Sequence, residues 1–345
     1  MPTRDIVVIG ASAGGVEALI SLVSKLPSDY AGSIFVVVHV PADTASLLPQ
    51  ILTLRGPLVA SHAKDGERID KGRVYVAPPD FHMILEGKKI RVIRGPKEHG
   101  VRPAVDPLFR SAALEFGPRV VGVILSGNLD DGSGGIIAVK QSGGATIVQD
   151  PAEALYPGMI NNALATGSAD HCLPIAEIPT HLHQLLRSGT IEGARAMTGG
   201  NGDIDEEEKE LAIDKLDFRQ LHSDDQPGIV STLTCPECNG ALWELSTGGT
   251  LRYRCRVGHA YAVESLLSEQ KSAIEAAFWM ALRALEERGA FLRRLADRAQ
   301  KIGSDQSHTR YTDEEKLVAS RAKTLRDVIL SGILTNGNES TIQQH

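Results

Sequence analysis

Short runs of Val and Ile alternate with segments of helical periodicity over residues 1–190, and this alternation restricts the possible folds most strongly. Expected strands are Asp5–Ile9, Ser33–Val40, Arg73–Val76, Val120–Leu125 and Thr146–Gln149. Expected helices between them are Val16–Leu26, Val105–Phe116 and Ile136–Ser142. Strands alternating with helices are typical of a parallel sheet with crossover helices. We therefore predict an α/β sheet domain, doubly wound and mainly parallel, with a hairpin of Met83–Glu86 and Lys89–Ile93 at its edge.

The composition changes after residue 190, which indicates further parts. Residues 191–229 form an expected acidic linker, partly helical at Glu207–Asp217. Residues 230–262, here called the cysteine module, carry three of the cysteines. Residues 263–335 show apolar side chains at helical spacing in Ala262–Ile302 and again in Asp313–Ile333. Two such helices would bury their apolar stripes as a hairpin, or as a coiled coil with another subunit.

Charge and composition exclude several classes of protein. A net charge of −7 argues against general binding to nucleic acid or to anionic membranes. No run approaches the ~20 apolar residues of a membrane-spanning helix, and the N-terminus does not resemble a signal peptide. We therefore expect a cytoplasmic protein with protein partners. The cysteines form no disulfide framework, and Cys172 is expected to be a buried thiol.

A glycine-rich loop, Gly10 to Gly15, joins the first expected strand to the first expected helix. A dinucleotide-binding loop would need glycine where Ser12 stands and an acidic residue at the end of the second strand, where His39 stands. The loop fits instead the Gly-x-Ser-x-Gly pattern of a nucleophile elbow, although many such strings are only turns.

His39 and Asp131 support the interpretation of this loop as a nucleophile elbow, because each follows another expected strand. Carboxyl ends of parallel strands meet at one edge of a sheet, and ligand sites gather there. A serine needs an imidazole to take its proton and a carboxylate to orient that imidazole. We therefore predict a catalytic triad of Ser12, His39 and Asp131, with the Ala13 amide as an oxyanion donor at the start of the first helix.

The sequence from about Asp5 to Leu186 resembles the catalytic domain of chemotaxis protein-glutamate methylesterases. The motifs that carry the resemblance are Ile9-Gly10-Ala11-Ser12-Ala13-Gly14-Gly15, Val38-His39-Val40-Pro41, Val76-Ala77-Pro78-Pro79, Arg102-Pro103-Ala104-Val105-Asp106 and Leu125-Ser126-Gly127 with Asp131-Gly132. The resemblance places Ser12, His39 and Asp131 at the nucleophile, base and orienting-acid positions. It implies hydrolysis of glutamate γ-methyl esters on methylated chemoreceptors, with deamidation of receptor glutamines as a second activity and no catalytic cofactor.

Two departures from the family pattern concern the oxyanion region and regulation. Many members have methionine where this chain has Asn128, the second candidate oxyanion donor. Well-known members carry an N-terminal receiver domain, whereas the first expected strand here already begins at Asp5. Control by an attached receiver is therefore not expected.

Arg102 and Asp106 are polar residues within a family motif and are candidates for substrate binding. The alternative is an Arg–Asp pair or a helix N-terminal charge that shapes the loop. His62, His82 and His99 have no partner spacing and receive no role.

The cysteine module contains two chelating pairs. Its candidate ligands are Cys235, Cys238, Cys255 and His259. Three thiolates and one imidazole at this spacing suit a tetrahedral zinc ion, and four protein ligands indicate a structural site in a zinc-ribbon-like module. Arg252, Arg254 and Arg256 are expected on an exposed strand face. We expect no nucleic-acid binding, and a module that folds independently of the sheet domain.

The leading hypothesis is thus a methylesterase of sensory signalling, fused to a zinc module and a helical tail. One alternative is a hydrolase in which the same triad cleaves small esters or amides. Another is a non-enzymatic docking or scaffold protein of a signalling system. The helical tail could mediate oligomer formation or bind a signalling partner.

Overall fold

The structure is a computed structural model that describes residues 3–43, 45–188, 208–213 and 228–331. The chain divides into two compact units, Met1–Leu266 and Leu267–His345. The first unit contains the sheet domain and the cysteine module.

The sheet domain is built on a seven-stranded sheet of order β3-β4-β2-β1-β7-β8-β9. Its strands are β1 (Ile6–Ala11), β2 (Ser33–Val38), β3 (Val59–His62), β4 (Arg73–Val76), β7 (Val120–Ile124), β8 (Ala145–Gln149) and β9 (His171–Leu173). Every neighbouring pair is parallel. The expected parallel α/β fold is therefore confirmed. The strand order reverses between β1 and β7, which is where doubly wound sheets bind ligands.

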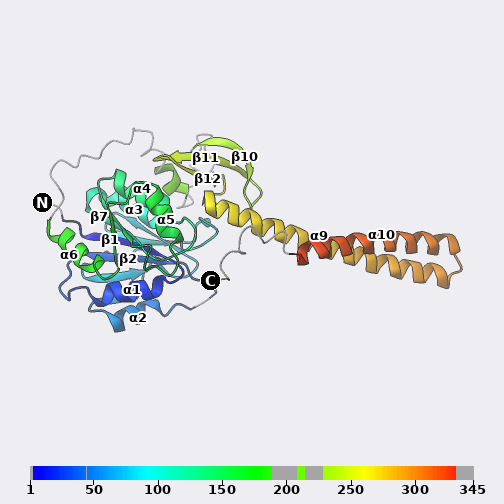
Figure 1. Ribbon diagram of the computed structural model, residues 1–345, viewed down its shortest axis with the longest axis horizontal. Coiled ribbons are helices and arrows are strands. Elements are labelled where there is room, and N and C mark those ends of the chain that lie inside the picture. The colour runs from blue at the N-terminus through cyan, green and yellow to red at the C-terminus, as the bar shows by residue number, and fades with distance from the viewer. Residues whose placement is uncertain (1–2, 44, 189–207, 214–227, 332–345) are drawn as a thin grey trace. The chain divides into compact units, whose positions relative to one another are not determined.

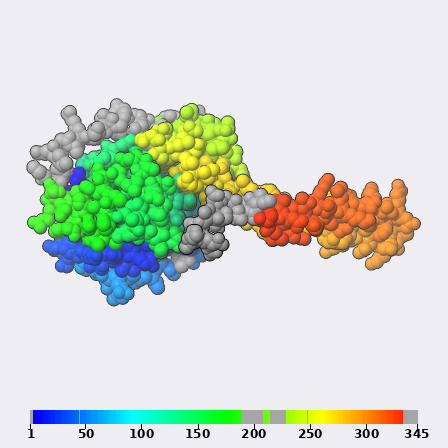
Figure 2. Space-filling model, viewed as in Figure 1, coloured from blue at the N-terminus to red at the C-terminus, as the bar shows by residue number. Residues whose placement is uncertain are grey.

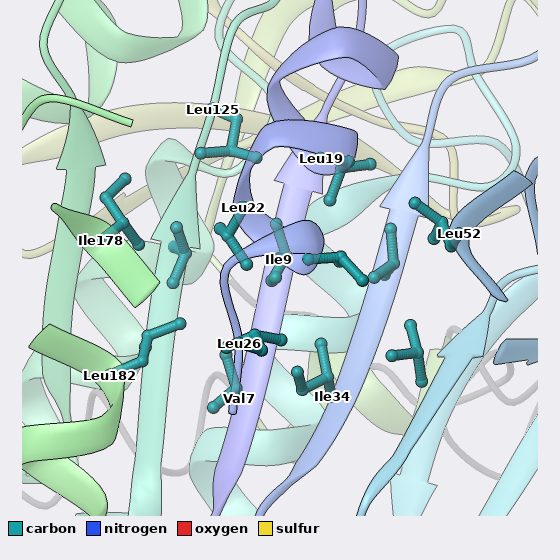
Figure 3. Close-up of a cluster of buried hydrophobic side chains, with 14 of the residues drawn as sticks. Val7, Ile9, Leu19, Leu22, Leu26, Ile34, Leu52, Leu125, Ile178 and Leu182 are labelled. Carbon is teal, nitrogen blue, oxygen red and sulfur yellow. The ribbon is translucent and has the colours of Figure 1, made fainter. Parts of the chain in front are cut away.

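Helices cover both faces of this sheet (Figure 1). The helices of the sheet domain are α1 (Gly15–Ser24), α2 (Leu48–Arg55), α3 (Val105–Phe116), α4 (Ser133–Gln141), α5 (Gly158–Ala165) and α6 (Ile178–Ser188), with a 3₁₀ turn at Gly117–Arg119. α1, α2 and α6 bury their apolar stripes on one face, where Leu19, Leu52 and Leu182 belong to the same buried cluster as Ile9 of β1 (Figure 3). α3, α4 and α5 pack on the other face. Burial on both faces explains why the central strands are uninterrupted Val and Ile runs.

Two expectations about the sheet domain are wrong. The hairpin of β5 (His82–Glu86) and β6 (Lys89–Ile93) is a separate two-stranded sheet, not an edge of the main one. It packs beside α3, where Ser111 Oγ accepts the Leu85 amide proton at 3.0 Å. Cys172 is exposed, not buried, because its short strand β9 lies at the outer edge of the sheet.

The cysteine module is a four-stranded antiparallel sheet of order β10-β11-β12-β13. Its strands are β10 (Ile229–Thr234), β11 (Ala241–Thr247), β12 (Thr250–Cys255) and β13 (Ala260–Ala262). The space-filling view shows the yellow residues of the module directly against the sheet domain (Figure 2).

The cysteine module contacts the sheet domain through main-chain hydrogen bonds and a buried ion pair. The Ala260 amide donates to the Lys97 carbonyl at 3.3 Å, and the His99 amide donates to the Ala260 carbonyl at 2.6 Å. Arg254 donates to Glu98 at 2.6 Å, and Arg252 donates at 2.9 Å to Glu210 in the helical segment 208–213. Both arginines are buried, so these two do not lie on the exposed strand face that was expected. Their charges pair with glutamates of the same unit instead.

Two long helices, α9 (Val263–Lys301) and α10 (Asp305–Leu330), confirm the expected C-terminal helices. They run antiparallel, since Arg326 pairs with Glu286 and Arg293 pairs with Glu315 at 2.6 Å. None of the helices in the described ranges has the length and apolarity needed to cross a membrane.

Candidate active site

Ser12 occupies a tight turn between β1 and α1. Its amide donates to the Ser126 carbonyl at 2.9 Å, which extends the pairing of β1 with β7, and its carbonyl accepts from the Gly15 amide at 2.9 Å. Gly14 has φ 70° and ψ −1°, the conformation of the third residue of a type II turn, which favours glycine. The turn therefore ends the strand at Ser12 and starts the helix at Gly15.

His39 directly follows the last pair of the β1–β2 ladder, as Ser12 does on the neighbouring strand. Ala11 pairs with Val38, and the His39 amide donates to the Ala11 carbonyl at 3.2 Å. Partners in neighbouring strands lie about 4.8 Å apart and direct their side chains to the same face. His39 Nε2 also lies 2.7 Å from Asp131 Oδ2. One turn, one strand end and the loop before α4 thus bring Ser12, His39 and Asp131 to a common edge.

The start of α3 holds the Asp131 carboxylate in place. The Val105 amide donates to Oδ2 at 2.7 Å, and the Asp106 amide donates to Oδ1 at 3.1 Å. Burial opposes ionisation of Asp131, but the nearby His99 charge, the His39 hydrogen bond and the amide donors outweigh it and lower the Asp131 pKa. Asp131 is therefore ionised and can accept the Nε2 proton of His39.

Ser126 is a supporting residue that received no separate role from the sequence. Its hydroxyl donates to the Ala13 carbonyl at 2.8 Å and accepts from the Tyr156 amide at 3.1 Å. It thereby fastens the Ser12 turn to the loop after β8. The sequence feature that could have indicated Ser126 is its position in the Leu125-Ser126-Gly127 motif.

We expect Gly127→Ala to lower turnover at this site while the fold is retained. A Cβ at Gly127 would stand 2.9 Å from Ser12 Cβ and 2.1 Å from Met159 Sδ, so it would displace the serine. Steady-state kinetics of the variant, alone and combined with Met159→Ala, check this. If the second substitution restored full turnover, the clash with Met159 and not the contact with Ser12 would be responsible.

The predicted substrate-binding residues have different surroundings. Arg102 lines a pocket of about 370 Å³ beside His39, with its guanidinium held by Asp80 and by the Gly95 carbonyl, both at 2.5 Å. Asp106 is fully buried and accepts from the Gly135 amide at 2.6 Å. This burial argues against contact between Asp106 and a substrate, and gives it a structural role at the start of α3.

The two candidate oxyanion donors come from different segments. Ala13 directly precedes Gly14, the N-cap of α1, where the helix dipole favours negative charge. Asn128 is exposed in the loop after β7, and a Cβ on Gly158 would stand 3.2 Å from its Cα.

Two buried residues missed by the sequence reasoning lie behind Asp131. His99 is within 3.5 Å of Asp131, and Asp130 accepts from the start of α9. His99 could not be found from spacing, because its partners come from three segments, the starts of α3 and α9 and the loop before α4. Asp130 directly precedes the predicted catalytic aspartate, but no sequence motif indicated a separate role for it.

The cysteine module brings its four candidate ligands together. Cys238 Sγ lies 3.6 Å from Cys255 Sγ, and His259 Nδ1 lies 3.7 Å from Cys235 Sγ and 3.6 Å from Cys255 Sγ. Glu237 accepts from His259 Nε2 at 3.0 Å, which directs Nδ1 toward the thiols. The arrangement could hold a metal ion.

A serine beside a histidine–aspartate pair, at the carboxyl edge of a parallel sheet, is the arrangement of a serine hydrolase. The sequence model of the CheB methylesterase family matches residues 7–182. This match covers just over half of the chain, and the chain belongs to that family.

Named relatives agree with this assignment. The chain is 37% identical over 183 residues to a protein-glutamate methylesterase/protein-glutamine glutaminase of Pyrococcus horikoshii, covering 52% of this chain and 50% of the relative. It is 39% identical over 189 residues to another, from Anaeromyxobacter dehalogenans, covering 54% and 52%. The chain thus spans about half the length of these curated relatives.

A solved structure is also similar to this chain. The crystal structure of the Thermotoga maritima CheB methylesterase catalytic domain aligns with a TM-score of 0.51 and 34% identity. The alignment covers 54% of this chain and 99% of that one.

Proposed function

We propose that this protein is a serine hydrolase that removes methyl groups from glutamate γ-methyl esters of chemoreceptors and deamidates receptor glutamines. The observation that carries the proposal is the 2.7 Å contact between His39 Nε2 and Asp131 Oδ2, directly beside the Ser12 turn. Relatives named for both activities support it.

Each nitrogen of His39 has its own role in the proposed reaction. An ionised carboxylate only accepts, so Nε2 carries the proton bound to Asp131, and Nδ1 is the basic nitrogen of the neutral ring. Nδ1 takes the Ser12 proton as Oγ bonds to the γ-carbonyl carbon. Collapse of the tetrahedral intermediate breaks the ester bond, and His39 protonates the leaving methoxide to give methanol. Water then hydrolyses the acyl-enzyme, with His39 again as the base. A glutamine substrate loses ammonia in the same steps.

Two further groups of residues complete the proposed site. The Ala13 and Asn128 amides are proposed oxyanion donors, helped by the positive end of α1. Arg102 is the proposed substrate contact, because it borders the pocket that opens beside His39. Methylated chemoreceptors are the proposed partners.

The test is methanol release from methylated receptors, measured beside hydrolysis of a generic ester such as p-nitrophenyl acetate. Preference for the receptor supports the methylesterase, and hydrolysis of the generic ester alone supports a small-ester hydrolase. A serine-directed fluorophosphonate probe separates both from a scaffold protein. Labelling should require Ser12 and His39, and absence of labelling in folded protein would refute an enzyme.

We further propose that the cysteine module holds one structural zinc ion. Sulfur at about 2.3 Å and nitrogen at about 2.0–2.1 Å from a tetrahedral zinc would lie roughly 3.5–3.8 Å from one another. The separations of 3.6–3.7 Å fit this tetrahedron. Bound zinc would link the turn between β10 and β11 to the end of β12 and the turn before β13. Four protein ligands leave no position for a substrate.

We expect Cys238→Ser to abolish stoichiometric metal binding and to destabilise the module, because such a small sheet has little core of its own. Elemental analysis and thermal unfolding of the purified protein measure both effects. Cys172→Ser is the matched control, since Cys172 lies outside the cluster. Undiminished zinc in Cys238→Ser would contradict the assigned ligand.

A further inference from the structure

His99 lies in a buried group of polar side chains behind the candidate triad. Its side chain is only 2% exposed. Nε2 lies 3.0 Å from Asp106 Oδ2, and Nδ1 lies 2.7 Å from Ser265 Oγ. Nε2 is also 3.5 Å from Asp131 Oδ1, and Nδ1 is 3.5 Å from Asp130 Oδ1. The ring therefore meets three carboxylates and a hydroxyl from the start of α9.

The contacts with Ser265 and Asp106 favour a proton on each nitrogen of His99. Ser265 Oγ donates its proton to Asp130 Oδ1 at 2.5 Å, so it accepts from Nδ1. The Asp106 carboxylate accepts from Nε2. The Ala262 amide also donates toward Nδ1, at 3.3 Å, and this bond by itself favours a lone pair on Nδ1. The three carboxylates around the ring, Asp106, Asp130 and Asp131, favour the doubly protonated form instead. His99 is thus an imidazolium. Burial opposes this charge, but Asp131, Asp106 and Asp130 outweigh it and raise the His99 pKa well above its usual value.

Asp130 and Asp131 bind the first turns of two different helices. Asp131 accepts amide protons from α3, as described above. Asp130 Oδ2 accepts the Glu264 amide at 2.8 Å and the Ser265 amide at 3.3 Å, both from α9. A carboxylate at a helix start satisfies amides that lack partners in the helix. The two adjacent aspartates therefore tie α9 to the loop that carries the candidate catalytic acid.

We propose that His99 is a positioning residue for the hydrolysis proposed above, and that Ser265 at the start of α9 holds it in place. His39 binds Asp131 at Oδ2, whereas His99 lies on the Oδ1 side of the same carboxylate. The cation keeps Asp131 ionised and fixes the plane of its carboxylate. This role rests on the proposed function of the triad, and it makes the first turn of α9 part of the support of the active site.

The effect of removing His99 depends on every charge around it. The groups facing the ring are Asp106 from α3, Asp130 and Asp131 from the loop before α4, and Ser265 from α9. Glu98, its neighbour in the chain, is paired with Arg110 and Arg254. Without the imidazolium, three buried carboxylates remain together, so Asp131 would take up a proton more readily and would then orient His39 poorly.

The test compares His99→Gln, Ser265→Ala and the control Ser272→Ala in the full-length, zinc-loaded protein. Ser272 is an exposed serine of the same helix. We expect His99→Gln to lower kcat for methanol release about 10-fold or more, with KM changed less than about twofold. The acid limb of its pH–rate profile should move to higher pH. Ser265→Ala keeps every charge and should lower kcat about fivefold, and Ser272→Ala should match wild type.

Amide hydrogen exchange at Val105 and Asp106 gives a readout that does not require activity. Both variants should exchange faster there, because these amides are donated to Asp131. Unchanged kcat and pH profile in folded Ser265→Ala and His99→Gln overturn the proposal. The proposal is also overturned if the loss of kcat in the variants parallels a loss of thermal stability while the pH–rate profile is unchanged. Inactive wild-type protein would instead overturn the proposed function itself, and the role of His99 with it.

Discussion

Replacing Ser12 by alanine should lower turnover of methylated receptor by about 10⁴-fold or more, because binding and oxyanion stabilisation cannot replace the nucleophile. The fold should survive, since the structure fixes the Ser12 turn by its backbone amide and carbonyl and not by the hydroxyl. Methanol release under single-turnover and steady-state conditions measures the loss. His39→Gln should behave alike, and Asp131→Asn somewhat less severely.

Ser24→Ala provides a matched control for the nucleophile. Ser24 ends the same helix that Ser12 precedes, and its exposed hydroxyl donates only to the Ser21 carbonyl at 3.0 Å among the hydrogen bonds the structure records for it. Its turnover should equal that of wild type. An active Ser12→Ala protein would refute the proposed mechanism.

The largest loss of stability is expected from Glu98→Gln. Glu98 is fully buried and accepts from Arg110 at 2.5 Å and from Arg254 at 2.6 Å. Burial opposes its charge, but the arginines outweigh burial and hold the Glu98 pKa well below its usual value. Removing one partner of a buried ion pair typically costs about 3–5 kcal/mol, because the other charges stay buried without compensation. Chemical denaturation of the full-length protein should show a loss of that size.

Glu86→Gln is the corresponding surface control. Glu86 pairs with Arg91 at 3.0 Å, and both side chains are more than a third exposed. Such a pair contributes about 0–1 kcal/mol. Equal losses for the two variants would contradict the importance of the buried cluster. A lowered pKa also sets the pH dependence: the stabilisation from Glu98 is present above its unfolded pKa and is lost as the pH falls, so acid should diminish the difference between wild type and Glu98→Gln.

Residues of the candidate site were recognisable because Ser12 and His39 directly follow strands of the sheet, and Asp131 lies in the loop that follows a third strand. The segments before Ser12 and His39 are rich in Val and Ile and can therefore be recognised as buried strands from the sequence. Parallel strands bring their carboxyl ends together at one edge of the sheet. Asp106 illustrates the limit of this reasoning. Its motif made it a candidate for substrate, but the tertiary fold buries it against Gly135 and His99. Sequence spacing could not distinguish a buried acid at a helix start from an exposed one.

The cysteine module shows the same limit. The sequence grouped its ligands correctly in space, since short chelating pairs constrain their own geometry. The burial of Arg252 and Arg254 was missed, because alternating arginines on a strand resemble an exposed face until their partners are known. Those partners, Glu98 and Glu210, lie far away in the chain.

By itself the sequence determined the parallel α/β sheet, the placing of His39 and Asp131 near one edge of it, and the clustering of the cysteines. These features depend on local periodicity and short spacings, which can be recognised in a single sequence. Only the tertiary structure decided that the cysteine module packs on the sheet domain, and that His99 and the start of α9 stand behind Asp131. Buried charged groups pair with groups that the fold brings close in space. Pairs such as Glu98 with Arg254 and Asp130 with Ser265 are far apart in the chain, so no sequence periodicity indicates them.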